Sequence, residues 1–128
     1  MDFISIVLRQ GDTYLVLLHN KQGIWTFPLG KIEPGETSHD CVVREAWEEL
    51  GIRVEQAELR FTTKHLSEKS RYFQGFHYEI LSYEGEPFNK EPEKHSGLQW
   101  FSKLTLIAQE ITKNHHVMHA FKSGLYDI

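Results

Sequence analysis

The segment from Gly30 to Ile52 constrains the fold of this chain more than any other stretch of its sequence. Its second half has the signals of a helix. Thr37 is a suitable N-cap, and Asp40, three residues later, can complete a capping box. Gly51 stands where a helix usually ends in a left-handed turn. These signals together predict a helix that begins after Thr37 and ends at Gly51.

Two rows of side chains follow this predicted helix with helical spacing. The apolar row consists of Val43, Ala46, Trp47 and Leu50. The acidic row consists of Glu45, Glu48 and Glu49. At about 100° per residue, the two rows should lie roughly opposite each other. The pattern therefore predicts an apolar stripe that faces the core and an acidic face on the other side.

The acidic row is unfavourable for a helix that has only to be stable. Like charges at i,i+4 repel, and Glu48 and Glu49 lie in the last turn, where the helix dipole is already negative. Each effect costs up to about 1 kcal/mol on a surface. A hard cation such as Mg²⁺ would relieve the repulsion, because it takes carboxylate oxygens as ligands. The alternative is a solvated acidic face in which Arg44 pairs with Glu48.

The residues ahead of the helix favour the metal-binding interpretation. From Gly30 the chain has five residues, then Glu36, then seven residues, and then the run REAWEELGI from Arg44 to Ile52. This pattern resembles, position for position, the signature of the Nudix hydrolases. The lead-in WTFPLGK is also similar to that family, whose members commonly have a glycine where this chain has Leu29.

The resemblance implies an α/β fold, the Nudix α/β/α sandwich, over one domain at 1–128. In that fold a mixed β-sheet lies between the helix of the Nudix box (30–52) and a C-terminal helix. The order of elements that the residues indicate on their own is compatible with it. Extended segments are expected at 3–8, 14–18, 54–63, 72–83 and 98–101, a helical turn at 104–109 and a helix at 113–123.

The resemblance also implies a reaction and a set of metal ligands. Nudix hydrolases cleave nucleoside diphosphates linked to another group, by attack of water on the pyrophosphate, and metal ions assist such reactions. The implied cofactor is Mg²⁺, with Mn²⁺ as the alternative. The implied ligands are Glu45, Glu48, Glu49 and the backbone carbonyl of Leu29.

Catalytic roles follow from the same resemblance. Glu45 is a metal ligand, the general base or the group that orients the base, and Glu48 belongs to the catalytic set. Arg44 is expected to hold a glutamate in place, since a guanidinium fork matches a carboxylate. Glu36 is expected to be a structural partner. Lys31 either contacts a phosphate or is simply solvated.

Two residues beyond the box complete the expected site. The loop GEPFNKE, from Gly85 to Glu91, resembles the corresponding loop of MutT-type hydrolases, in which Glu91 supplies a fourth carboxylate. Glu93 is the local competitor for that role. Asn114 stands where MutT-type enzymes have an asparagine that reads a purine edge. The alternative for Asn114 is an ordinary N-cap.

These residues favour a Mg²⁺-dependent nucleoside triphosphate pyrophosphohydrolase that acts on a small-molecule nucleotide, with a modified purine as one candidate. Dihydroneopterin triphosphate and diadenosine polyphosphate are alternative substrates. A nucleotide-binding sensor without catalysis is the third hypothesis. The sequence leaves open which nucleotide and which phosphorus are attacked, and whether the chain is a monomer or a dimer.

The composition narrows the partners and the location. Among the 128 residues the formal net charge is −4, and no Lys/Arg run occurs. Broad binding to nucleic acid or to anionic membranes is therefore not expected. No apolar run approaches the ~18 residues of a transmembrane helix, and the single Cys41 cannot form an intrachain disulfide. We expect a cytoplasmic protein.

Overall fold

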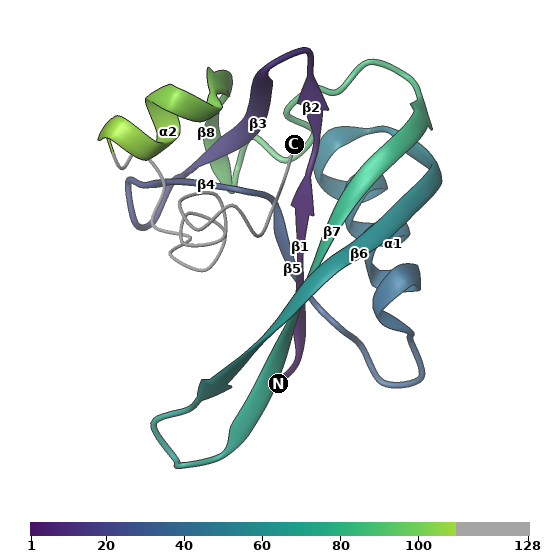
Figure 1. Cartoon of the computed structure of the whole chain (residues 1–128), viewed down its shortest axis with the longest axis vertical. Helices are drawn as coiled ribbons and strands as arrows, with labels where there is room; N and C mark the ends of the chain where they lie inside the picture. Colours follow the sequence, from purple (N-terminus) through teal and green to yellow (C-terminus); the bar gives the residue numbers. More distant parts are fainter. Residues whose placement is uncertain (110–128) are drawn as a thin grey trace.

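The computed structural model describes residues 1–109, which form two β-sheets and two helices. Figure 1 shows the long strands β6 and β7 crossing the molecule, with α1 against them and the second sheet at the opposite end. The chain leaves the first sheet after its first strand, forms most of the second, and returns to the first at β5, before α1 begins. The predicted site residues within 1–109 lie in β5, in α1 and in the loop between β7 and β8.

The first sheet, sheet A, is mixed, with the strand order β5-β1-β7-β6. Its strands are β1 (Phe3–Val7), β5 (Leu29–Lys31), β6 (Arg53–Leu66) and β7 (Tyr72–Glu84). β1 pairs with β7 in parallel, whereas the other two pairings are antiparallel. Because Phe3 of β1 is level with Gly75 of β7, the tip of the β6–β7 hairpin projects past the start of β1.

The second sheet, sheet B, is antiparallel and is built around β3. Its strands are β2 (Arg9–Gln10), β3 (Thr13–His19), β4 (Trp25–Thr26) and β8 (His95–Ser102), and β8 leads into α2 (Lys103–Gln109). β8 pairs along the whole length of β3, while β2 and β4 pair with its two ends. Residues 14–17 of β3 are buried, as their continuous apolar run predicts for a strand covered on both faces.

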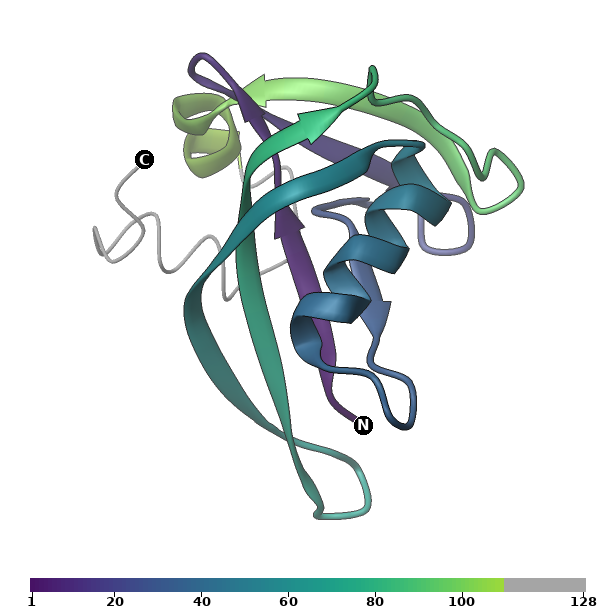
Figure 2. The same ribbon diagram turned by 90° about the vertical axis from the view of Figure 1, so that its right-hand side faces the viewer.

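The helix α1 (Ser38–Leu50) lies across one face of sheet A, as Figure 2 shows. Its ends are those that the sequence predicts. The hydroxyl of Thr37 accepts a hydrogen bond from the backbone N–H of Asp40 at 3.0 Å, and the Asp40 carboxylate accepts one from the Thr37 N–H at 3.3 Å. Gly51 ends the helix at φ 67°, a left-handed conformation in which a side chain would be strained.

The predicted orientation of α1 is wrong by roughly a quarter turn. Its buried residues are Cys41, Val42, Ala46, Glu49 and Leu50. Trp47, predicted to face the core, is 50% exposed, and the ammonium of Lys90 lies 3.6 Å from the centre of its ring. An indole can be accommodated at a surface by such a cation–π contact, so its hydrophobicity does not by itself place it in a core. The rotation turns Glu49 inward.

Alternation along β1 divides the core between the two faces of sheet A. Ile4, Ile6 and Leu50 belong to the cluster beneath α1. Val7 belongs to a second cluster on the other side, with Phe27 and with Leu106 of α2. This arrangement confirms the predicted α/β class and its mixed sheet. The helix expected at 113–123 lies outside the described residues. Neither helix within 1–109 is long and apolar enough to cross a membrane.

Candidate functional site

Arg44 is the centre of a network of charged hydrogen bonds on α1. Its Nε and Nη2 donate to the two carboxylate oxygens of Glu36 at 2.7 and 3.0 Å. Its Nη1 donates to Glu45 at 2.9 Å and to Glu48 at 3.1 Å. Nη2 also donates to the backbone carbonyl of Lys31 at 3.0 Å. The paired guanidinium lowers the pKa of Glu36 to about 2, so Glu36 is ionised and anchors Arg44 between β5 and the helix.

The side chain of Glu45 packs directly on the backbone of β5. A Cβ added at Gly30 would lie 2.3 Å from Cγ of Glu45, closer than two carbon atoms can approach. Only glycine therefore allows this glutamate to occupy its place between the helix and the strand. The side chain of Glu45 is 13% exposed, and this burial raises its pKa against the pull of Arg44.

Glu49 is a buried carboxyl group, with only 7% of the residue exposed. Among the described residues, its Oε2 has no hydrogen-bond partner. Burial, followed by the negative charges of Glu45 and Glu91, raises the pKa of Glu49 to about 9. An unpartnered buried oxygen is costly, and its presence beside two other carboxyl groups is a feature that a bound cation would stabilise.

The loop between β7 and β8 brings Glu91 to this carboxyl group. The backbone N–H groups of Phe88 and Lys90 donate to the carbonyls of Leu50 and Glu49, both at 3.1 Å, so the loop closes over the last turn of α1. The side chain of Glu91 is 19% exposed, and its charge acts on Glu49. Its sequence competitor Glu93 is exposed. Of the two, the structure brings Glu91 to the cluster.

Glu48 is the most exposed glutamate of the helical row, with 46% of its side chain accessible. Glu48 and Glu45 each accept a hydrogen bond from Arg44. Glu45 also shares a hydrogen bond with Glu49. Within residues 1–109, no three Asp, Glu, His or Cys side chains converge closely enough to hold a metal as they stand. A cation would have to draw Glu48 and Glu45 away from Arg44.

The donor set nevertheless fits a hard divalent cation. The cluster offers carboxylate oxygens from Glu45, Glu49 and Glu91, with Glu48 at the rim, and Mg²⁺ prefers oxygen ligands. The free Oε2 of Glu49 is a ligand position without a partner among the described residues. All four of these side chains are carboxylates, the ligand type that suits Mg²⁺ and Mn²⁺ rather than a softer metal.

Leu29 and Lys31 lie on either side of Gly30 in β5. Since neighbouring residues of a strand alternate between faces, their side chains point away from α1. Both line a cavity of about 470 Å³ whose other walls include Met1, Phe3 and Phe73. The cavity and the carboxylates therefore lie on opposite sides of one short strand. Asn114 lies outside the described residues.

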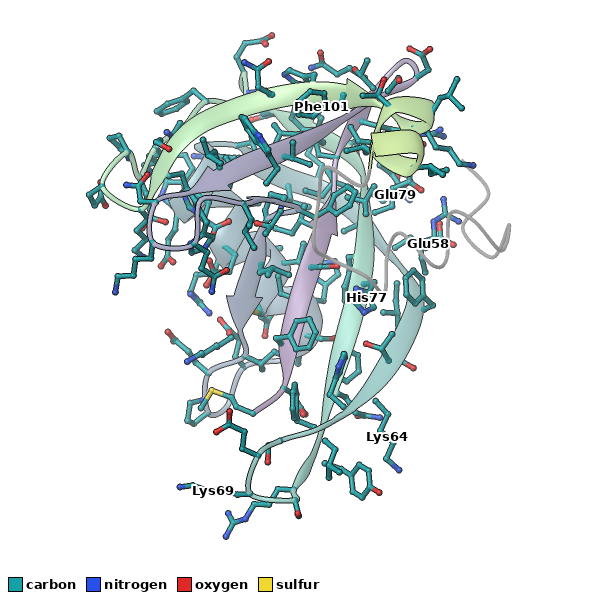
Figure 3. The ribbon with its side chains drawn as sticks, turned by 90° about the vertical axis from the view of Figure 1, so that its left-hand side faces the viewer. Glu58, Lys64, Lys69, His77, Glu79 and Phe101 are labelled. Carbon is teal, nitrogen blue, oxygen red and sulfur yellow. The ribbon has the colours of Figure 1, made fainter. Side chains whose placement is uncertain are left out.

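Two buried polar residues on the face of sheet A that is turned away from α1, His77 and Glu79, were not predicted from the sequence. Figure 3 shows His77 and Glu79 along β7, on the side turned away from α1. The imidazole of His77 is within 2.6 Å of the Ser5 hydroxyl and 2.9 Å of the Thr63 hydroxyl, and Glu79 pairs with Arg9 at 3.2 Å. Their positions between the apolar residues Phe76, Tyr78 and Ile80 were the available signal. This face of the sheet is therefore polar as well as aromatic.

The family model of the NUDIX domain matches residues 2–121 of this chain. The chain belongs to the NUDIX family. This match confirms the resemblance inferred from the box. Arg44, Glu45, Glu48 and Glu49 lie on α1 within the Nudix box, and Glu91 lies in the loop that closes over the end of that helix.

Individual relatives agree with this assignment. The chain is 36% identical over 107 residues to the 8-oxo-dGTP diphosphatase of Escherichia coli K12, covering 84% of this chain and 75% of that protein. It is 32% identical over 107 residues to the NAD-capped RNA hydrolase NudC of Photobacterium profundum, covering 82% of this chain. The chain spans only 39% of that second relative, and less than two thirds of the first curated relatives it matches.

A solved structure supports the same fold. The MutT protein from Bacillus halodurans superimposes with a TM-score of 0.75 at 28% identity, over 98% of this chain and 82% of that one. The Nudix fold, with its box helix against a mixed sheet, is therefore shown for this chain.

Proposed function

We propose that this Nudix domain hydrolyses a nucleoside triphosphate in the presence of Mg²⁺ or Mn²⁺, releasing the monophosphate and pyrophosphate. The observation that carries the proposal is the buried oxygen of Glu49, which has no hydrogen-bond partner within residues 1–109 and lies beside Glu45 and Glu91. A cluster of this kind is suited to a cation that in turn binds a polyphosphate. The similarity to a diphosphatase of 8-oxo-dGTP supports a triphosphate substrate.

The residues of the chain divide into three roles in this proposal. The cation would be held by the carboxylates of Glu45, Glu48, Glu49 and Glu91 and by the carbonyl of Leu29. Bound Mg²⁺ supplies charge neutralisation at the phosphate oxygens and acidifies water. Arg44, anchored by Glu36, would keep Glu45 and Glu48 beside the cluster until a cation draws their carboxylates away from it. Either Glu45 or Glu91 takes the proton of the attacking water, since both lie at the cluster and neither is needed to anchor Arg44.

The cavity beside β5 is the proposed place for the nucleoside. Its walls are aromatic at Phe3 and Phe73, and aromatic rings stack on bases. Lys31 lies at the cavity on the strand that separates it from the carboxylates, where its ammonium can meet a phosphate. The phosphates of a nucleotide whose base lies in the cavity would have to extend past β5 to reach the cluster. A pterin would fit the same description, so dihydroneopterin triphosphate remains the alternative substrate.

A hydrolysis screen tests the proposal. Purine and pyrimidine triphosphates, 8-oxo-dGTP, dihydroneopterin triphosphate and diadenosine polyphosphates would be incubated with protein and Mg²⁺, and the products separated. We expect monophosphate and pyrophosphate from at least one triphosphate. Release of single phosphate from every substrate, or turnover of dinucleotides alone, would contradict the proposed reaction. The cytoplasmic location inferred from composition remains a prediction.

Asn114 is proposed to read a purine edge. Asn114→Ala should then raise KM for the best purine triphosphate by roughly 10–100-fold, the effect of losing a bidentate contact, and should spare pyrimidine turnover. If Asn114 is only a helix cap, the variant should instead lose about 1 kcal/mol of stability, with all substrates affected alike. Melting curves and kcat/KM for one purine and one pyrimidine separate the two outcomes.

A further inference from the structure

The loop that carries Glu91 also carries a cation of its own. The ammonium of Lys94 lies 3.1 Å from Oε2 of Glu91, three residues earlier in the same turn. The contact with Glu91, together with the charges of Glu45 and Glu49, which also act on this ammonium, raises the pKa of Lys94. In the structure, Lys94 therefore supplies positive charge to the carboxylates that the proposed function assigns to a metal.

The turn around Lys94 is fixed by its backbone. The N–H groups of Lys94 and His95 donate to the carbonyl of Glu91 at 2.9 and 3.0 Å. The backbone N–H of Asn20 donates to the Lys94 carbonyl at 3.0 Å, and the Asn20 amide side chain donates to the Glu93 carbonyl at 2.9 Å. The position of Glu91 is thus set by hydrogen bonds that do not involve the Lys94 side chain.

The side chain of Lys94, in contrast, is free to move. It is 60% exposed, whereas that of Glu91 is 19% exposed. Exposed ion pairs of lysine are weak, and lysine has a long flexible stem that carries a point charge. The ammonium can therefore leave Glu91 without disturbing the turn. A divalent cation competes for the same oxygen with twice the charge.

We infer that Lys94 is a displaceable counter-ion of Glu91. A divalent cation takes the place of its ammonium at Glu91, and the ammonium then binds the phosphates of the substrate. The inference rests on the proposed function, because it takes Glu91 as a metal ligand. It assigns Lys94 a role that the Nudix box does not contain. Lys94 would be a phosphate-binding residue released at the moment when the metal arrives.

Two binding measurements test this role without any turnover. In the first, Mn²⁺ is titrated calorimetrically into nucleotide-free protein. Lys94→Met removes the competitor, so we expect Mn²⁺ to bind about two- to five-fold more tightly, the range that an exposed ion pair allows. In the second, inorganic pyrophosphate is titrated into the Mg²⁺-loaded protein. We expect about tenfold weaker binding by Lys94→Met, because a charge-assisted contact is lost.

Lys90→Met is the matched control for the change of charge. Lys90 lies on the same loop, but its ammonium is held over the Trp47 ring and donates to the Trp47 carbonyl at 3.3 Å. Lys90→Met should change the affinities for Mn²⁺ and for pyrophosphate by less than about 1.5-fold. Lys94→Arg should retain most of the pyrophosphate binding. Melting curves will show that Lys94→Met is folded, since the side chain is exposed.

Each result decides one part of the inference. Unchanged or weaker Mn²⁺ binding by Lys94→Met, or an equal gain in Lys90→Met, would overturn the counter-ion role. Unchanged pyrophosphate binding would overturn the phosphate role. Both failures are distinct from failure of the proposed function. In that case the wild-type protein would neither bind Mn²⁺ nor turn over any triphosphate, and the inference would be overturned too.

Discussion

Glu49 is the residue whose environment departs furthest from what its sequence position predicts. A glutamate is seldom buried without a partner, so a row of glutamates on a helix indicates a solvated face. The contact between Trp47 and Lys90 permits the rotation that buries Glu49, and it joins residues from two distant segments. The spacing of the carboxylates could be predicted from sequence, whereas their burial depends on packing that no local pattern contains.

The raised pKa of Glu49 makes a prediction about stability and pH. A glutamate in an unfolded chain has a pKa near 4.3, whereas in the folded protein the pKa of Glu49 is about 9. Between about pH 4.3 and about pH 9, Glu49 is protonated in the folded state and ionised in the unfolded state. The free energy of unfolding of the wild-type protein therefore falls as the pH rises through this window. Glu49→Gln should remove this fall.

Urea unfolding of the metal-free protein at pH 5, 7 and 9 measures it. The free energy of unfolding of Glu49→Gln relative to wild type should increase steadily from pH 5 to pH 9. A difference that stays constant over this range would show that Glu49 is not protonated in the folded protein.

Glu49→Gln, which should stabilise the folded protein at high pH, should lower its catalytic activity. Glu48→Gln and Glu49→Gln each keep the size of the side chain and remove a charged ligand, so kcat should fall by well over about tenfold. The melting temperature should be unchanged or higher. Glu48→Gln relieves repulsion within the acidic row, and Glu49→Gln removes the cost of keeping a buried carboxyl group protonated. Near-normal turnover in both variants, measured with the best triphosphate, would place the catalytic site elsewhere.

At the scale of elements, the spacing between β5 and α1 is the feature that positions the carboxylates. The caps of α1 could be predicted because each is local: Thr37 and Asp40 bond to each other in the first turn, and Gly51 bonds to carbonyls of the last turn. The contact of Gly30 with Glu45 could not, because it depends on how the helix lies on the strand. The family signature marks Gly30 without giving this reason for it.

Gly30→Ala tests that spacing. The added Cβ would lie 2.3 Å from Cγ of Glu45, so the carboxylate must move out of the cluster. We expect a loss of stability of about 1–3 kcal/mol and a fall in kcat of at least about tenfold. Gly97→Ala is the control, since its Cβ would meet the Trp25 ring at 3.2 Å, in sheet B. Equal losses of activity in the two variants would contradict a specific role for Gly30.

At the scale of the molecule, the five longer strands and α1 were predicted from the sequence, whereas the short strands β2, β4 and β5 and the pairing of all the strands were not. The turns at 11 and 23 and the extended segments are local features, whereas β1 pairs in parallel with a strand some seventy residues later. That pairing creates the face on which His77 meets Ser5, and it places Phe3 at the cavity beside β5. Figure 3 shows how much of this face comes from residues distant in sequence.

Metal dependence is the most direct test of the central claim, that a cluster of carboxylates on the Nudix helix holds a catalytic cation. Turnover of the best triphosphate would be measured in excess EDTA, then with Mg²⁺ added back, at several pH values. The carboxylate cluster predicts no turnover in EDTA, recovery with Mg²⁺, and a rate that rises toward alkaline pH as water is more easily deprotonated. Full turnover in excess EDTA would contradict the claim.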